Sequence, residues 1–91
     1  MMDVRLNKLK ELVFPNSDVV KDDRKKSLRK YNLKRAMALG NLYKRRVNVH
    51  FRTMDGYLKR VEATVWSVGE EFISFRAGIS LPIKAIEKVE F

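Results

Sequence analysis

The sequence contains no cysteine and no long run of hydrophobic residues. Without cysteine, neither a disulfide framework nor a thiolate-bound zinc site can supplement the core, so apolar packing must supply the stability. A bilayer-spanning helix needs about 18 or more uninterrupted apolar residues, which this chain lacks. The opening residues 1–5 also lack the apolar segment of a secretory signal. We therefore expect a cytoplasmic protein with no membrane partner.

Recognisable catalytic patterns are missing as well. No serine lies in a G-x-S-x-G context, and the four glycines form no phosphate-binding loop. The acidic pairs Asp22-Asp23 and Glu70-Glu71 point to opposite sides in an extended chain, so neither pair supplies a matched acid and base. The single histidine, His50, has no helical carboxylate motif nearby, which favours an ordinary surface strand residue over a metal ligand. We expect no enzyme, no metal site and no cofactor.

Positive charge is concentrated in one part of the chain. The 91 residues carry 20 Lys and Arg against 11 Asp and Glu. Residues 1–20 hold three of each sign and residues 47–91 hold six of each, so both segments are neutral. Residues 21–46 hold eleven basic and two acidic side chains, which places the whole net charge of +9 in this segment. Such a block raises the local potential and indicates an anionic partner, either nucleic acid or an acidic protein surface.

Two helical segments are expected before the sheet. Apolar residues recur at spacings of three and four over residues 4–13, which predicts a short helix there. A second helix is predicted over residues 33–39, with Asn32 as its N-cap and Gly40 in a left-handed C-terminal conformation. The basic residues 24–30 either extend this helix or form a mobile arm, because like charges four residues apart repel.

The apolar period changes to two in the second half of the chain, which predicts antiparallel strands. Val47, Val49 and Phe51 alternate with polar residues, and residues 54–56 have the Asp-Gly chemistry of a hairpin loop with Gly56 left-handed. The apolar faces of the two strands coincide in one register. This register pairs Phe51 with Lys59, Val49 with Val61 and Val47 with Ala63.

A long second strand is expected over residues 57–67, followed by a turn at 68–70 and a third strand over 71–76. Their pairing sets Trp66 against Phe72 on the outer face. Such an aromatic pair could stack unpaired bases, or a helix from the N-terminal half could cover it. Both interpretations stay open from the sequence.

The end of the chain has the pattern of two further strands. Pro82 predicts an edge position for the fourth strand, because proline cannot donate a hydrogen bond to the ladder. A helical turn is expected at residues 84–86, before a last strand in which Val89 and Phe91 point inward. These two strands also offer edges through which the protein could form a homo-oligomer.

The order of parts from residue 32 onward resembles a known architecture. It consists of a leading helix over 32–40, a first turn at 54–56, and a closing segment over 81–91 that joins a strand, a helical turn and a final strand. This order resembles that of the small SH3-like and Sm-like β-barrels. Relatives of that architecture include the RNA-binding Sm and Hfq rings and the Rho-binding antiterminator family. The resemblance therefore implies a role in binding nucleic acid or the machinery that handles it.

We predict an α+β protein in which N-terminal helical segments precede a five-stranded antiparallel SH3/Sm-like β-barrel. Residues 1–20 form a short helix and turn, residues 21–41 form a basic helical segment, and residues 42–91 form the barrel. A chain of this length has room for one domain with one modest core.

The predicted function is the binding of nucleic acid, RNA in preference to DNA, through contacts of the basic segment 21–46 with backbone phosphates. A solvated helix face that keeps the protein soluble is the plainer alternative. A third interpretation is a non-enzymatic adapter in transcription or translation, which would dock a protein on the barrel surface or a strand edge. The predicted contact residues combine cations with aromatic and imidazole side chains: Lys25, Lys26, Arg29, Lys30, Arg35, Arg45, Arg46, Trp66, Phe72 and His50.

Overall fold

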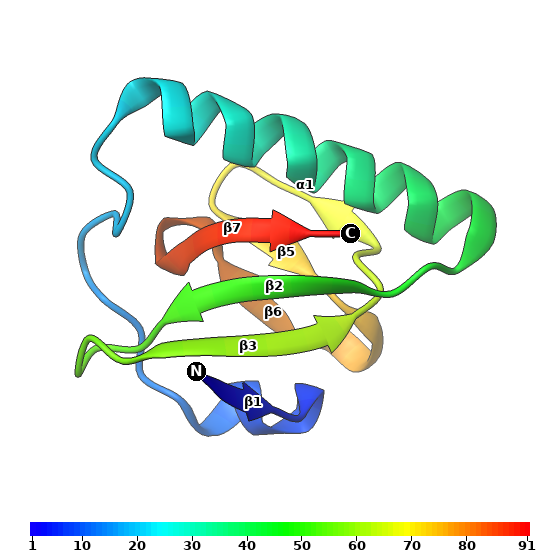
Figure 1. The fold of residues 1–91 in the computed structure, drawn as a ribbon. Coiled ribbons are helices and arrows are strands. Elements are labelled where there is room, and N and C mark those ends of the chain that lie inside the picture. Colours follow the sequence, from blue (N-terminus) through cyan, green and yellow to red (C-terminus); the bar gives the residue numbers. More distant parts are fainter.

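One long helix, α1 (Asp23–Tyr43), lies across the sheets in the computed structural model, which describes all 91 residues (Figure 1). Asp22 is its N-cap, and the Asp22 side chain accepts a hydrogen bond from the Arg24 backbone N–H at 2.8 Å. Lys44 ends the helix in a left-handed conformation with a φ of 55°. The acidic Asp23 in the first turn also suits the positive end of the helix dipole.

The helix predicted over residues 33–39 is longer in the structure because packing holds its basic upstream part. Asn32 does not cap the helix and Gly40 does not end it, so both of those predictions are wrong. Gly40 is needed inside the helix, since an added Cβ would lie 2.5 Å from the carbonyl oxygen of Val65. The residues buried along the inner face recur at spacings of three and four: Arg29, Leu33, Ala36 and Gly40.

The N-terminus adds a strand to the main sheet, and the helix predicted over residues 4–13 is only a six-residue 3-10 helix. β1 (Met2–Val4) pairs in parallel with β3 (Leu58–Ala63), and a short 3-10 helix, η1 (Leu6–Glu11), follows it. β3 has a free edge, which binds this extended segment. Asp3 secures this pairing through an ion pair with an arginine of β3 at 2.6 Å.

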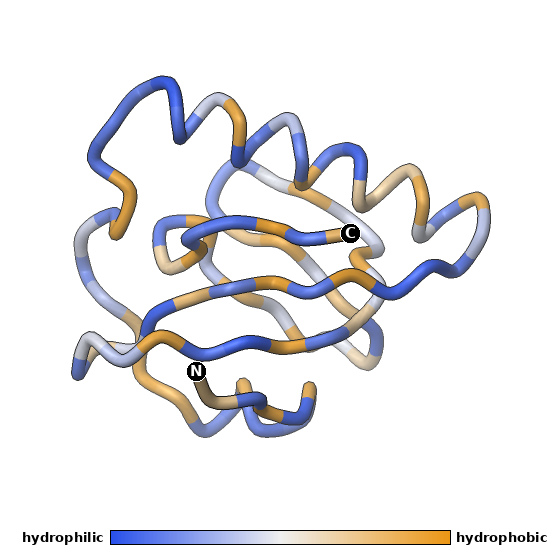
Figure 2. Tube along the Cα trace, viewed as in Figure 1, coloured by the Kyte–Doolittle hydropathy of each residue, from blue (hydrophilic) through white to orange (hydrophobic).

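The larger sheet contains four strands in the order β1-β3-β2-β7, with β2 at Val47–Arg52 and β7 at Ile86–Glu90. β2 and β3 pair in the predicted register, with Val49 opposite Val61. Gly56 in the hairpin loop has a φ of 87°, which confirms its predicted left-handed conformation. Figure 2 shows hydrophobic and hydrophilic positions alternating along β2 and β3, as expected for strands with one buried face.

Three short strands form a second sheet in the order β4-β5-β6. They are β4 (Ser67–Val68), β5 (Phe72–Ser74) and β6 (Ser80–Pro82). A tight turn, η2 (Arg76–Gly78), connects β5 to β6. β6 pairs only with β5, so Pro82 lies on an edge strand, as the sequence predicted.

The register of the second hairpin differs from the predicted one, and the outward pair of Trp66 and Phe72 does not form. The Trp66 backbone N–H donates to the carbonyl of Ser74 at 2.9 Å, and the Gly69 N–H donates to the carbonyl of Phe72 at 2.8 Å. The hairpin loop therefore contains two residues, where a three-residue turn was expected. Trp66 and Phe72 lie at opposite ends of the short hairpin.

The two sheets do not close on each other, so the predicted five-stranded antiparallel SH3/Sm-like barrel with N-terminal helices is wrong. Residues 64–66 leave the ladder between β3 and β4, which splits the long second strand that the sequence predicted. β1 occupies the free edge of β3 and makes the larger sheet a mixed one. Since β7 pairs only with β2 and β6 only with β5, no strand pair joins the two sheets.

The hydrophobic core lies between α1 and the two sheets, as the arrangement in Figure 1 indicates. It is one cluster of 15 buried residues, drawn from η1, the helix and most of the strands. Phe51 of β2 is fully buried, and the ring of Phe14 packs against it with centroids 6.0 Å apart. Burial of each large apolar side chain contributes about 1.5–3 kcal/mol to folding.

The C-terminal residues follow the predicted order with small shifts. The helical turn predicted at 84–86 is a 3-10 turn, η3 (Ile83–Ala85), directly before β7. Val89 is buried as predicted, but Phe91 lies beyond the strand on the surface, where the guanidinium carbon of Arg35 lies 4.3 Å from the centre of its ring. The chain has no helix with the length and apolar character needed to cross a bilayer.

Candidate functional site

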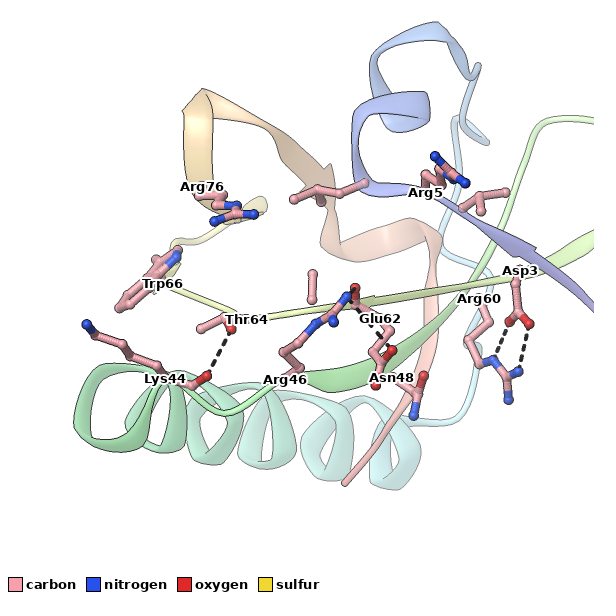
Figure 3. A pocket seen from close by; sticks show the side chains of 13 residues that line it. Asp3, Arg5, Lys44, Arg46, Asn48, Arg60, Glu62, Thr64, Trp66 and Arg76 are labelled. Carbon is pink, nitrogen blue, oxygen red and sulfur yellow. Dashed lines mark hydrogen bonds and ion pairs between the residues drawn. The ribbon is translucent and has the colours of Figure 1, made fainter.

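A cleft of about 650 Å³ opens between the N-terminal strand, the end of α1 and the turn η2 (Figure 3). Its lining has only four hydrophobic residues among thirteen. Two carboxylates, Asp3 and Glu62, also face the cleft. The cations that line it come from four separate segments of the chain: Arg5, Lys44, Arg46, Arg60 and Arg76.

The floor of the cleft is the outer face of the first hairpin. Asn48 and Glu62 are cross-strand partners in β2 and β3, and the chain continues from this pair toward the end of α1. Arg46 donates to the Glu62 backbone carbonyl at 3.2 Å, and the Thr64 hydroxyl donates to the Lys44 carbonyl at 3.4 Å. These bonds hold residues 44–46 beside residues 62–64, beyond the last regular pair of the β2–β3 ladder.

The two ends of the cleft differ in electrostatic character. At one end, Arg60 donates to both carboxylate oxygens of Asp3 at 2.6 and 3.0 Å, which lowers the pKa of Asp3 and raises that of Arg60. At the other end, Lys44 and Arg76 have no carboxylate partner, and Arg5 has none either. The positive potential of the cleft is therefore strongest where these cations are left unpaired.

Trp66, the only tryptophan of the chain, lies at the unpaired end of the cleft. Figure 3 shows its indole ring between Arg76 and Lys44, which approach it from two sides. The ring is partly exposed, and its N–H has no hydrogen-bond partner within the protein. An aromatic face and a free donor are thus both available to a ligand.

Two strained backbone positions border the same end of the cleft. Lys44, with a φ of 55°, and Ala77, with a φ of 60°, are the only residues other than glycine with positive φ. A left-handed conformation costs such a residue about 1–2 kcal/mol. Ala77 directly follows Arg76, so both strained residues fix the direction of a cation beside Trp66. Strain of this kind is concentrated at functional sites in proteins generally.

A second, smaller cleft of about 440 Å³ runs along α1. One side is a row of lysines at spacings of four, Lys26, Lys30 and Lys34, and the other side includes Gly69 and Glu70 of the β4–β5 turn. Residues 64–70 border both clefts, since their first half lines the larger cleft and their second half lines the smaller one.

Arg29, a predicted phosphate contact, is buried and serves the fold instead. Its guanidinium is 6% exposed and donates to both carboxylate oxygens of Asp18 at 2.8 Å and to the Ile86 carbonyl at 2.9 Å. The hydrogen bond from Arg29 lowers the pKa of Asp18, and the Val20 backbone N–H adds to the effect. Asp18 lies eleven positions upstream, so charge counting within residues 21–46 could not reveal this pair.

His50 was expected on the surface of its strand but is 3% exposed. Its Nε2 contacts the Glu90 carboxylate, its Nδ1 has no partner, and its cross-strand neighbours are Arg60 and Lys88. The hydrogen bond with His50 lowers the pKa of Glu90. No group of three His, Asp or Glu side chains comes close enough to hold a metal ion.

The remaining predicted residues are distributed over several surfaces. Arg46 and Trp66 come together in the larger cleft, and Lys26 and Lys30 line the smaller one. The others lie elsewhere: Lys25 on the exposed surface of α1, Arg35 over Phe91, Arg45 in the exposed turn after α1, and Phe72, 50% exposed, on β5.

Most residues of the larger cleft were not among the predicted site residues, including Arg5, Asn48 and Arg76. Arg5 and Arg76 belong to charge-neutral segments, so the charge distribution gave no reason to select them. Asn48 makes no side-chain hydrogen bond and resembles any polar residue of an alternating strand. The strained turn beside Arg76 contains an Ala-Gly pair, whose glycine is the one local signal for it.

No family model, no curated protein and no solved structure matches the chain.

Proposed function

We propose that the protein binds RNA, chiefly through its backbone phosphates. The observation that carries this proposal is the lack of internal neutralisation in the basic segment. Of the eleven cations in residues 21–46, only Arg29 and Arg46 have a carboxylate within ion-pair distance. Of the nine others, Lys21 lies just before α1, six lie on α1, and Lys44 and Arg45 lie in the turn that leads from α1 to β2. Such a surface attracts polyanions at low and physiological salt.

The shape of this surface supports RNA over duplex DNA. A helix that reads a DNA groove presents polar side chains on its exposed face. The exposed face of α1 instead carries Leu28, Tyr31 and Leu42, while its lysines flank the smaller cleft. Clefts that combine cations with an exposed aromatic ring suit the unstacked bases of RNA loops and single strands.

The test is the salt dependence of binding, measured by fluorescence anisotropy with labelled RNA and DNA of mixed sequence. Six to ten phosphate contacts would lower the affinity by about 10³- to 10⁵-fold between 50 and 200 mM salt. The variant K30E/R45E should bind far more weakly and show a shallower salt slope, by about one unit for each contact removed. The matched control K84E/K88E, with the same change in charge on another surface, should bind nearly as well as the wild type.

A protein that ignores RNA and DNA even at low salt would overturn this proposal. One observation would then favour the adapter hypothesis, namely the apolar side chains Leu28, Tyr31 and Leu42 on the exposed face of α1. Exposed apolar patches with a polar rim are typical of protein interaction sites. If K84E/K88E and K30E/R45E bind RNA equally weakly, RNA responds to the net charge of the protein and not to one defined surface.

A further inference from the structure

The larger cleft has the size and lining of a site for a small flat group. Ligand sites in proteins commonly enclose about 300–1,000 Å³, and this cleft encloses about 650 Å³. Trp66 is the one aromatic ring in the lining, and it lies at the end where the cations have no carboxylate partner. An indole in a positively charged cleft suits a nucleobase, because bases stack on aromatic faces while the cations hold the adjoining phosphates.

Polar groups that could contact the edge of a base have no partners within the protein. The Asn48 carboxamide offers both donors and an acceptor, and the Trp66 indole N–H offers one donor. Both line the cleft, and neither takes part in a side-chain hydrogen bond. A polar group left unpaired in a partly enclosed site gains most from a ligand that supplies the missing partner.

The strained positions explain how the cations are aimed. The conformations of Lys44 and Ala77 each cost about 1–2 kcal/mol, which packing elsewhere must offset. In return, Lys44 and Arg76 are set on two sides of the indole ring (Figure 3). The conformation of Lys44 also ends α1, because the Lys44 backbone N–H donates to the Gly40 carbonyl at 2.9 Å.

We propose that the cleft binds one unpaired nucleotide of single-stranded RNA. Its base stacks on Trp66, and Lys44 and Arg76 hold the phosphates on either side. This inference rests on the proposed function and narrows it, since it names single strands as the ligand class. Bases inside a duplex are already stacked and paired, so a duplex can reach only the surrounding cations.

The experiment uses the single tryptophan as its reporter. Wild-type protein is titrated with oligoadenylate, with an RNA duplex and with inorganic polyphosphate while the Trp66 emission is recorded. We expect quenching by oligoadenylate alone, although all three ligands bind at low salt. In a parallel anisotropy assay, Trp66→Leu should weaken oligoadenylate binding about 5- to 150-fold, which corresponds to one lost stacking contact. Binding of polyphosphate and duplex by this variant should not change.

Trp66→Phe should restore part of the affinity, because it retains an aromatic face. Tyr57→Leu removes another exposed aromatic ring, on the first hairpin loop, and should bind like the wild type. Arg76→Gln keeps the test valid if Trp66→Leu fails to fold, because Arg76 is exposed in a surface turn. This variant should lower the affinity for single strands and leave the affinity for the duplex unchanged.

The outcomes separate this inference from the proposed function. If single strands and duplexes bind equally and Trp66 emission stays constant, the nucleotide site is refuted while phosphate-driven RNA binding stands. If the wild type binds neither RNA nor polyphosphate at low salt, both proposals fail. If polyphosphate quenches Trp66 as strongly as oligoadenylate does, the cleft is an anion site without a base, and the inference is again overturned.

Discussion

The close approach of α1 to the segment after β3 can be tested with Gly40→Ala. An ideal Cβ at residue 40 would lie 2.5 Å from the Val65 carbonyl oxygen and 2.8 Å from the Thr64 methyl carbon. Ordinary contacts begin near 3.4 Å, so the helix would have to move by about 0.9 Å. The nearer obstacle is the backbone of Val65, which cannot move aside as a flexible side chain can.

Two opposing effects set the magnitude. In an unhindered helix, replacing glycine by alanine stabilises the protein by about 0.5–1 kcal/mol. Overpacking a tight contact costs about 1–3 kcal/mol, and a backbone obstacle belongs in the upper part of that range. We therefore expect Gly40→Ala to reduce the free energy of unfolding by about 1–2 kcal/mol. For a domain of this size, that corresponds to a fall in melting temperature of about 4–16 °C.

Thermal and urea unfolding followed by circular dichroism measure this change. Asn41→Ala is the matched control, because Asn41 is exposed on the same turn and alanine there should be neutral or stabilise the helix by a few tenths of a kcal/mol. If Gly40→Ala is as stable as the wild type or more so, the helix does not touch residues 64 and 65. The same shift would separate Lys44 from Trp66, so Gly40→Ala should also weaken oligoadenylate binding.

Three further predictions concern stability. Asp18→Ala leaves the buried Arg29 unpaired and should cost about 3 kcal/mol in urea unfolding, whereas a loss below about 0.5 kcal/mol would contradict a structural role. Arg29 holds the folded-state pKa of Asp18 below its ordinary value of 3.8, so this stabilisation is complete above about pH 4 and is lost as acid protonates the folded carboxylate. Asp18→Asn should lack that acid-dependent loss in unfolding measured against pH. Ala77→Gly removes backbone strain and should raise the free energy of unfolding by about 0.5–1 kcal/mol, and a decrease would show that Ala77 is not left-handed. Leu33→Ala should cost about 2–5 kcal/mol, with an unchanged melting temperature as the contrary result.

The first hairpin shows what local patterns in this sequence could predict. The alternation along β2 and the Asp-Gly pair in the following loop are both local, since they lie within about ten residues of each other. Together they select one register for the pairing of β2 with β3. The structure has that register, with Gly56 left-handed as expected. Pro82 likewise restricts its own strand to an edge, whatever the rest of the chain does.

The second hairpin and the N-terminus depended on information that no local pattern contains. A three-residue β4–β5 loop produced matching side-chain pairs on both faces, but the structure has a two-residue loop in a hairpin whose strand β4 contacts α1. The pairing of β1 with β3 joins segments 57 positions apart in the sequence. Apolar spacing over residues 4–13 suited a helix, and residues 6–11 form the short 3-10 helix η1, but nothing in that spacing indicated that residues 2–4 would pair with the free edge of β3.

Only part of the candidate site could be predicted, and for the same physical reason. The charge block directed attention to the segment that contains Lys44 and Arg46, and Trp66 was selected through an aromatic pair with Phe72 that does not form. The fold brings Arg5 and Arg76 to them from segments whose own charges cancel. The fold also buries Arg29, which pairs with Asp18, a residue outside the charge block.

Arginines on the outer face of the larger sheet are paired with carboxylates, whereas the lysines along α1 are not. On the outer face of the larger sheet, Arg52 pairs with Glu87 at 2.7 Å and Arg60 pairs with Asp3 at 2.6 Å. Along α1, Lys26, Lys30 and Lys34 follow one another at spacings that bring like charges together, with no carboxylate on the helix between them. Carboxylates thus neutralise the arginines of the sheet, but none neutralises the lysines of α1, where an ion pair would stabilise the helix.

This unbalanced helix explains how ligand binding and stability are linked. Each like-charge pair costs a few tenths of a kcal/mol, so added salt should raise the melting temperature of the free protein by screening the repulsion. If RNA binds these cations as proposed, and binds only the folded state, it should relieve the same repulsion and add about 2.7 kcal/mol at a ligand concentration 100 times its Kd. Because salt also weakens phosphate contacts, the stabilisation by RNA must shrink as the stabilisation by salt grows. Along one salt titration, the melting temperature of the free protein should therefore rise while the added stabilisation by RNA falls. This is the result expected if the unpaired helix cations bind a polyanionic ligand.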